Sequence, residues 1–89
     1  MPFFSVIVAS FNKEKTIGKT IESLLAQTFK DFEIILIDDG SADHTKEIVT
    51  AFSDSAIKYH FQKNAGVTNA RNKGVELSRG TYLAFLDAD

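Results

Sequence analysis

The sequence predicts an α/β fold in which a parallel sheet is built from alternating strands and helices, in the order β-α-β-α-β-α-β. Four short apolar runs alternate with three segments whose apolar residues recur at helical spacing, and polar residues follow every apolar run. Strands that alternate with helices indicate parallel pairing through right-handed crossovers. We therefore expect a three-layer α/β/α arrangement, one half of a doubly wound fold, as a single domain over residues 1–89.

The four predicted strands fall at residues 3–11, 32–38, 56–61 and 81–86. The first two (FFSVIVASF and FEIILID) are predominantly apolar, which is typical of strands buried on both faces of a parallel sheet. The third (AIKYHF) alternates, with Ile57, Tyr59 and Phe61 on one face, and is therefore expected to be more exposed. The fourth (TYLAFL) is again apolar.

The three predicted helices lie between the strands and are recognised by apolar residues on one face. These residues are Ile17, Ile21, Leu24 and Leu25 within 12–27, then Ile48, Val49 and Phe52, and finally Val67, Ala70, Gly74 and Leu77 within 67–78. Ser41 and Asp43 are the N-cap candidates of the second helix. Gly74 would allow close packing of the third helix on the sheet, and Gly80 is expected to cap that helix at its C-terminus.

Polar side chains follow the strands and are expected to converge. They are Ser10 and Asn12 after the first strand, Asp38 and Asp39 after the second, Asn64 after the third, and Asp87 and Asp89 after the fourth. The carboxyl ends of parallel strands meet at one edge of the sheet, where doubly wound folds bind ligands. We therefore expect a single site built from several loops.

Asp87 and Asp89 are candidate metal ligands. Separated by one residue, they would point to the same side of a strand, and two carboxylates this close need a cation beside them to stay ionised. Hard oxygen ligands favour Mg²⁺ or Mn²⁺, which would bridge the protein to a diphosphate. The alternative interpretation is a solvated acidic turn.

Asp38, Asp39 and Arg71 are candidates for contact with a nucleotide. We expect one aspartate to brace the turn and the other to accept hydrogen bonds from a base or a ribose. Arg71 would reach a base carbonyl or a phosphate, or else lie on the surface. His44 and His60 are interpreted as surface residues, and no glycine-rich phosphate loop is present.

The composition argues against several kinds of partner, metal site and membrane segment. The net charge of −2 gives no argument for nucleic acid or an anionic membrane as a partner, and the absence of cysteine excludes disulfides and thiolate metal sites. No apolar run reaches the roughly 18–20 residues of a membrane span, and the N-terminus does not resemble a signal peptide. Lys13, Lys15 and Lys19 are interpreted as a solvated helix face, and a cytoplasmic location is expected, with attachment to a membrane face only through segments outside this sequence.

Five motifs occur in order: V-I-V-x-[ST]-[FY]-N, S-L-L-x-Q-[TS], D-D-G-S-x-D-x-T, N-x-G-x-x-x-A-R-N-x-G and F-L-D-A-D. Together they make the whole chain resemble the N-terminal half of family 2 glycosyltransferases with the GT-A fold, a Rossmann-like nucleotide-binding half. One small departure is Ala9, where the family often has proline. A haloacid-dehalogenase-type phosphatase or a receiver domain would place its acidic pair after the first strand instead.

The resemblance implies transfer of a sugar from a nucleoside diphosphate sugar, usually a UDP-sugar, with inversion, as in polysaccharide biosynthesis. It assigns nucleotide binding to Ser10, Asn12, Asp38, Asp39, Arg71 and Asp87. Asp39 would contact the base, often uracil, and Arg71 would reach the same base. Asp87 and Asp89 match the D-x-D motif, which holds Mg²⁺ or Mn²⁺ against the diphosphate.

The family pattern continues beyond the D-x-D motif, with the acceptor site and a general base, usually an aspartate. We therefore expect the general base beyond residue 89, a saccharide, lipid-linked or protein acceptor, and no sugar transfer by this piece alone. An uncovered fourth strand predicts self-association, and a non-catalytic, oligomerising nucleotide-binding fragment is the alternative function. The site at Asp87 and Asp89 is expected to be frayed and poor in metal.

Overall fold

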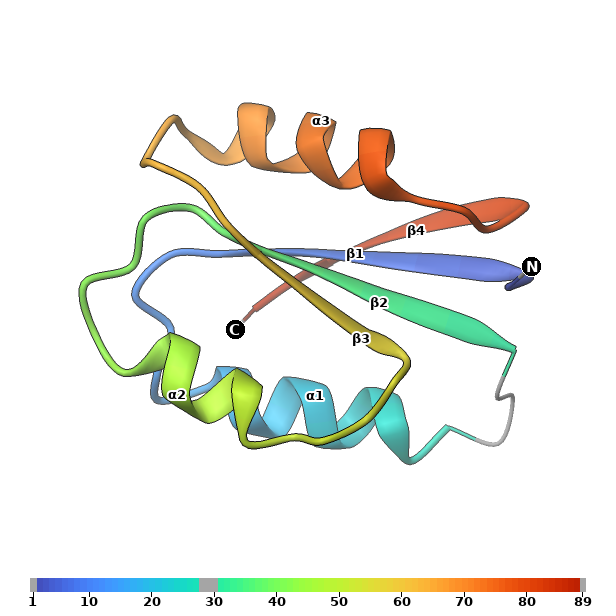
Figure 1. Cartoon of the computed structure of the whole chain (residues 1–89), viewed down its shortest axis with the longest axis horizontal. Coiled ribbons are helices and arrows are strands. Elements are labelled where there is room, and N and C mark those ends of the chain that lie inside the picture. Colours follow the sequence, from blue (N-terminus) through green and yellow to red (C-terminus); the bar gives the residue numbers. More distant parts are fainter. Residues whose placement is uncertain (1, 28–30, 89) are drawn as a thin grey trace.

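The computed structural model describes residues 2–27 and 31–88. The elements are β1 (Phe4–Ser10), α1 (Ile17–Leu25), β2 (Phe32–Asp38), α2 (Thr45–Thr50), β3 (Ile57–Phe61), α3 (Val67–Leu77) and β4 (Tyr82–Asp87). Figure 1 shows the sheet between two helical layers, with α1 and α2 on one face and α3 on the other. The predicted three-layer α/β/α arrangement and element order are confirmed.

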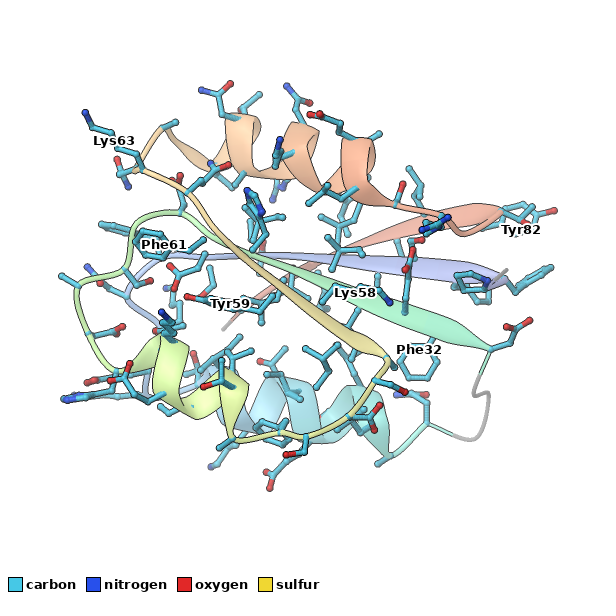
Figure 2. The ribbon with its side chains drawn as sticks, in the orientation of Figure 1. Phe32, Lys58, Tyr59, Phe61, Lys63 and Tyr82 are labelled. Atoms are coloured by element: carbon cyan, nitrogen blue, oxygen red, sulfur yellow. The ribbon has the colours of Figure 1, made fainter. Side chains whose placement is uncertain are left out.

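The strand order is β3-β2-β1-β4, and every pairing is parallel. Ser10 at the end of β1 pairs with Asp38 at the end of β2, and Ala9 pairs with Asp87 at the end of β4. The strands therefore end together at one side of the sheet, which we call the carboxyl edge. Figure 2 shows Phe61 and Lys63 at this edge, and Phe32 and Tyr82 at the opposite end of the sheet.

Both faces of β1 and β2 are buried, as their predominantly apolar sequences predict. The core on the side of α1 and α2 contains Val8, Ile17, Ile21, Ile34, Leu36, Val49 and Ala88. The core on the side of α3 contains Ile7, Ile35, Ile37 and Ala70. Gly74 brings α3 close to this second core, because a Cβ at this position would overlap Cγ2 of Ile7. The predicted close packing at Gly74 is confirmed.

The first helix begins later than its apolar pattern suggests. The predicted helical segment started at residue 12, but α1 begins at Ile17. Asn12 has a φ of 53°, in the left-handed region that a helix interior does not contain. In the third helix, Val67 and Leu77 were predicted to share the buried face, yet they are 52% and 39% exposed, respectively, because both lie at the ends of α3.

Two predicted helix caps were wrong. The N-cap of α2 is His44, although the carboxylate of Asp43 accepts hydrogen bonds from the backbone N–H (3.0 Å) and the hydroxyl (2.6 Å) of Thr45. The C-cap of α3 is Ser78, and Gly80 lies beyond it, packed against β1. A Cβ on Gly80 would lie 2.6 Å from the backbone nitrogen of Ser5, so glycine is needed for the chain to pass close to β1.

The two edge strands differ in exposure. On β3, Ile57 and Tyr59 pack against the core, whereas Phe61 is 52% exposed. On β4 all six residues are exposed, including Tyr82 and Phe85. β4 is thus exposed, as expected for an uncovered fourth strand, and it is more exposed than the alternating strand β3. Among the helices within residues 2–27 and 31–88, none has the length and apolar character needed to cross a membrane.

Candidate functional site

A cleft of about 380 Å³ opens at the carboxyl edge of the sheet. Its lining comes from the ends of the strands and the start of α3: Ala9, Ser10, Phe11, Lys13, Asp39, Asn64, Gly66, Val67, Ala70, Asp87 and Ala88. We call this cavity the edge cleft. It brings together Ser10, Asp39 and Asp87 from three different strand ends, as predicted, while Asn12, Asp38 and Arg71 are outside its lining.

Asp39 organises the loop that follows β3. Its carboxylate is almost fully buried and accepts hydrogen bonds from Nε2 of Gln62 (2.9 Å), the N–H of Ala65 (2.9 Å), the N–H of Gly66 (3.0 Å) and Nδ2 of Asn64 (3.3 Å). Burial acts to raise the pKa of Asp39, but the hydrogen bonds from Gln62, Ala65 and Gly66 outweigh it and hold the pKa below its ordinary value. The cleft therefore contains a fixed negative charge at the end of β2.

Asp38 braces the neighbouring turn and is fully buried. Its Oδ2 accepts a 2.6 Å hydrogen bond from the phenol of Tyr59, and its Oδ1 accepts one of 2.9 Å from the N–H of Ser41. Burial, followed by the hydrogen bond to Asp38 and its charge, raises the pKa of Tyr59 well above its usual range. One aspartate braces the turn and the other lines the cleft, which is the division that the sequence suggested.

Asn12 joins two loops. Its N–H donates a 2.8 Å hydrogen bond to Oγ of Ser41, and its Oδ1 accepts one of 2.9 Å from the N–H of Ala42. The residues on either side of Asn12, Phe11 and Lys13, line the edge cleft instead. Sequence reasoning missed both of these residues, because it placed Phe11 in a strand and Lys13 on a helix, whereas they lie in the loop after β1.

Ser10 lines the cleft and carries a buried hydroxyl. Its side chain is 2% exposed, and its Oγ has no hydrogen-bond partner within the part of the chain that the structure describes. Its carbonyl accepts a 2.8 Å hydrogen bond from the N–H of Asp39, so the backbone of Ser10 is held in place. Buried hydroxyls are nearly always hydrogen-bonded, so this unpaired oxygen is unusual among the described residues.

Asp87 and Arg71 form an ion pair at the wall of the cleft. Nη2 of Arg71 lies 3.3 Å from Oδ1 of Asp87, and the two side chains are 45% and 78% exposed, respectively. Asp87 lines the edge cleft, while Arg71 lines a second cavity of about 470 Å³ between α3 and β4. We call this second cavity the α3–β4 groove; its lining also includes Thr68, Asn72, Val75 and Phe85.

The chain directly after β4 is held in place up to Ala88. This residue is buried, and its carbonyl accepts hydrogen bonds from the hydroxyls of Thr16 (2.8 Å) and Thr20 (3.2 Å) of the first helical region. The chain is therefore anchored as far as Ala88, and the frayed site expected at Asp87 and Asp89 stays a prediction. The predicted metal ligand Asp89 lies outside the described residues.

Of the two predicted metal ligands, the structure describes only Asp87. Within residues 2–27 and 31–88, no three acidic or imidazole side chains gather as a metal-binding group. Asp87 is an exposed carboxylate at the cleft wall, an oxygen ligand of the type that Mg²⁺ or Mn²⁺ prefers, although its present partner is the guanidinium of Arg71.

Comparison with known proteins identifies relatives along the whole chain. A family model described as Glycosyl transferase family 2 matches residues 5–89. The chain is 43% identical over 91 residues to an uncharacterized glycosyltransferase, EpsJ of Bacillus subtilis, covering 100% of this chain and 26% of that protein. It is 42% identical over 92 residues to the Escherichia coli UDP-Glc:alpha-D-GlcNAc-diphosphoundecaprenol beta-1,3-glucosyltransferase WfaP, covering 100% of this chain and 36% of that protein. The chain thus spans only about a quarter to a third of these relatives.

Solved structures share the fold. The crystal structure of S. aureus TarS 1-349 in complex with UDP-GlcNAc superimposes with a TM-score of 0.94 and 34% identity, over 100% of this chain and 27% of that one. Glucosyl-3-phosphoglycerate synthase from Mycobacterium tuberculosis, in complex with Mn²⁺, UDP and glucosyl-3-phosphoglycerate, has a TM-score of 0.79 and 26% identity, over 99% of this chain and 34% of that one.

Proposed function

The chain belongs to glycosyltransferase family 2, and from this membership we propose that it binds the nucleotide of a nucleoside diphosphate sugar whose sugar passes to a hydroxyl acceptor. The edge cleft carries the proposal, because Asp39 with its fixed carboxylate, Ser10 with its buried unpaired hydroxyl and Asp87 with its exposed carboxylate line one cavity of about 380 Å³. Cavities of a few hundred cubic ångströms are typical of small-ligand sites. The UDP-GlcNAc bound by TarS and the UDP-Glc in the name of WfaP support a UDP-sugar as donor.

The nucleotide-binding residues fall into two groups in this proposal. Ser10 and Asp39 line the cleft: the hydroxyl of Ser10 gains its missing hydrogen bond when the nucleotide binds, and Asp39 holds the loop after β3 and exchanges one of its four donors for the base. Asn12 and Asp38 support nucleotide binding indirectly. Their side chains accept hydrogen bonds from the loop after β2 and stabilise the wall of the cleft. Phe11, an aromatic ring that is 46% exposed at the cleft, offers a surface on which a base can stack.

In this proposal a divalent cation binds at the end of the cleft near Asp87, where the diphosphate of the nucleotide would lie. Asp87 and Asp89 would hold Mg²⁺ or Mn²⁺ there, a role supported by the exposed carboxylate of Asp87 and by the Mn²⁺ and UDP in the mycobacterial synthase. When bound, such a cation supplies Lewis-acid stabilisation of the departing diphosphate. Residues 2–27 and 31–88 contribute the carboxylate of Asp87 and the wall of the cleft.

Inverting transfer also needs a general base that takes the proton of the acceptor hydroxyl. Among the described cleft residues, Asp39 is held by four donors with a lowered pKa, and Asp87 is committed to the cation, so neither suits this task. We assign the base and the acceptor site to sequence beyond this chain, and we expect no transfer by the chain alone. A saccharide, a lipid-linked saccharide or a protein would serve as acceptor; the lipid-linked substrate in the name of WfaP favours the second.

A non-catalytic, self-associating nucleotide-binding unit is the second candidate. It is supported by β4, an edge strand whose six residues are all exposed, four of them large and apolar: Tyr82, Leu83, Phe85 and Leu86. Unpaired apolar edges of this kind favour association with other strands. Gel filtration of the 89-residue chain over a range of concentrations tests this candidate, which predicts association that increases with concentration while UDP binding is retained.

Calorimetric titration of UDP into the full-length protein tests the main proposal. We expect binding that requires Mn²⁺ or Mg²⁺ and that weakens at least about tenfold in Asp87→Asn, because an anionic ligand of the cation is lost. Glu76→Gln is the matched control, since it removes a carboxylate from the exposed face of α3 and should leave UDP affinity unchanged. UDP binding that is indifferent to both metal and Asp87 would contradict the assignment.

A further inference from the structure

Thr16, just before α1, is hydrogen-bonded to two separate parts of the cleft lining. Its N–H donates a 3.1 Å hydrogen bond to the carbonyl of Lys13, which lines the edge cleft in the loop after β1. Its hydroxyl donates one of 2.8 Å to the carbonyl of Ala88, which lines the same cleft after β4 and lies 72 residues further along the chain. A single residue therefore joins the two segments.

The hydroxyl of Thr16 does not do what its position in the helix favours. Thr16 is the N-cap of α1, where a threonine oxygen usually accepts a hydrogen bond from an N–H of the first turn. Within residues 2–27 its side chain makes no such bond, and the hydroxyl is directed to Ala88 instead. The helix thus lacks a stabilising cap contact, and departures of this kind from local preference are expected where a functional site requires them.

Thr20, one turn later on α1, supports the same contact. Its Oγ1 lies 3.2 Å from the carbonyl of Ala88 and 3.2 Å from the carbonyl of Thr16, so its one proton is shared and it is the weaker donor to Ala88. Ala88 itself is 2% exposed and packs in the core that contains Ile17 and Ile21 of α1. The segment after β4 is therefore held by α1 through both packing and hydrogen bonds.

The sheet does not provide this support at the end of β4. Among the described strands, β1 is the neighbour of β4, and their register ends where Asp87 lies opposite Ala9. All six residues of β4 are exposed, so the strand is held mainly along one edge. Beyond Asp87 the position of the chain depends on the contacts of Ala88 with α1.

We propose that Thr16, supported by Thr20, is a positioning residue of the edge cleft, which fixes the segment Asp87–Ala88 relative to the loop after β1 and so sets the affinity for the nucleotide. The inference rests on the proposed function, from which it takes the ligand of the cleft. Neither threonine belongs to the cleft lining found among the described residues, so each acts through the backbone that it holds. Ligand sites need such support, because a loosely held wall lowers affinity.

Calorimetric titration of UDP into the full-length protein, in the buffer that supports binding to the wild type, tests the proposal. Thr16→Val keeps a similar shape but removes the hydroxyl, and UDP affinity should fall roughly 2- to 10-fold, the effect of one lost hydrogen bond. Thr16→Ser keeps the hydroxyl and should bind UDP nearly as the wild type does. Thr20→Val should have a smaller effect than Thr16→Val, and the double variant a larger one than either.

Thr50→Val is the matched control. The hydroxyl of Thr50 donates a 2.8 Å hydrogen bond to the carbonyl of Lys46 on the exposed side of α2, so the same chemical change is made away from the cleft and should leave UDP affinity unchanged. Melting temperatures of all variants separate folding from binding. The proposal would be overturned if Thr16→Val lowered the melting temperature but not UDP affinity, or if Thr16→Ser bound UDP as weakly as Thr16→Val.

Hydrogen exchange of the nucleotide-free, full-length protein, followed by mass spectrometry, tests the positioning without any ligand. The double variant Thr16→Val with Thr20→Val should exchange faster in peptides from residues 82–88, while peptides from β3 keep the wild-type rate. If UDP does not bind the wild type but exchange rises in this way, the nucleotide function fails and the positioning of the segment stands. If UDP binds the wild type and neither exchange nor UDP affinity changes in the variants, the function stands and the positioning role is refuted.

Discussion

Tyr59 on the edge strand β3 donates a 2.6 Å hydrogen bond to the fully buried carboxylate of Asp38 at the end of β2. The other oxygen of Asp38 accepts from the N–H of Ser41, so the phenol completes the partners of a carboxylate that water does not reach. An edge strand thus supports the turn behind the cleft through one side chain.

Removing this phenol should destabilise the protein. Tyr59→Phe leaves an oxygen of Asp38 buried without its donor, and the free energy of unfolding should fall by about 1–3 kcal/mol. Tyr82→Phe is the matched control on the other edge strand: Tyr82 is 54% exposed, and the change should stay within about 0.5 kcal/mol. Urea denaturation measures both, and equal losses in the two variants would contradict the role of the phenol.

A methyl group at Gly74 should be harmful, although alanine favours helices. In Gly74→Ala the new Cβ would overlap Cγ2 of the buried Ile7, and the strain of overpacking, typically 1–3 kcal/mol, exceeds the gain in helix propensity. Gly18→Ala in α1 is the control, because its Cβ would lie 3.6 Å from Ile48, an ordinary contact, so the melting temperature should hold or rise.

If the overlap is the cause, the double variant Ile7→Ala with Gly74→Ala should be more stable than the sum of the two single effects predicts. Strict additivity of the two changes would contradict this explanation.

A buried carboxylate far from the cleft should make stability depend on pH. Burial acts to raise the pKa of Glu33, but hydrogen bonds from Ser5 Oγ (2.6 Å) and the N–H of Arg79 (2.7 Å), together with Lys58, outweigh it, so the folded pKa lies below the ordinary value of 4.5. A carboxyl with a depressed folded pKa contributes stability above its unfolded pKa, and this contribution is lost as pH falls through the folded value.

Glu33→Gln should therefore cost about 1–2 kcal/mol of unfolding free energy at pH 7, and the difference from the wild type should shrink below pH 4.5. Glu76→Gln, an exposed residue of α3, should change little at any pH. Denaturation curves at several pH values provide the measurement, and a Glu33→Gln effect that is constant from pH 7 to pH 3 would rule out the ionic contribution.

Ser10→Ala should separate stability from binding. The Oγ of Ser10 is buried without a partner among the described residues, so its removal should leave the melting temperature of the ligand-free protein unchanged or slightly raised. The affinity for UDP with Mn²⁺ should fall by roughly 2- to 10-fold, the effect of one lost hydrogen bond. A large loss of stability with unchanged UDP affinity would show that the hydroxyl serves the fold instead.

The element order and the position of the site were predictable because they depend on patterns that lie close together in the chain. The run at 32–38 is apolar apart from Glu33 and its last residue, Asp38, and the structure gives β2 these bounds. Parallel pairing then brings Ser10, Asp39 and Asp87 to one edge whatever the details of the loops.

The directions of the side chains that follow the strands were not predictable in the same way. Asn12 turns toward Ala42 and Ser41, which lie about 30 residues away in sequence, and no local pattern indicates this contact. Asp38 and Asp39 are adjacent and chemically identical, yet only the fold decides that Tyr59 meets the first and the loop after β3 meets the second.

The central place of β1 in the sheet has a consequence for synthesis. β1 is made before every strand that flanks it, and although β2 follows within about 30 residues, its other neighbour, β4, is complete only at residue 87. At translation rates of 5–20 residues per second, one edge of this apolar strand stays unpaired for on the order of 4 to 15 s. Among the strands, β1 therefore has the longest interval between its own synthesis and the completion of its two neighbours. During that interval its apolar edge is the one we expect a chaperone to bind as the chain leaves the ribosome.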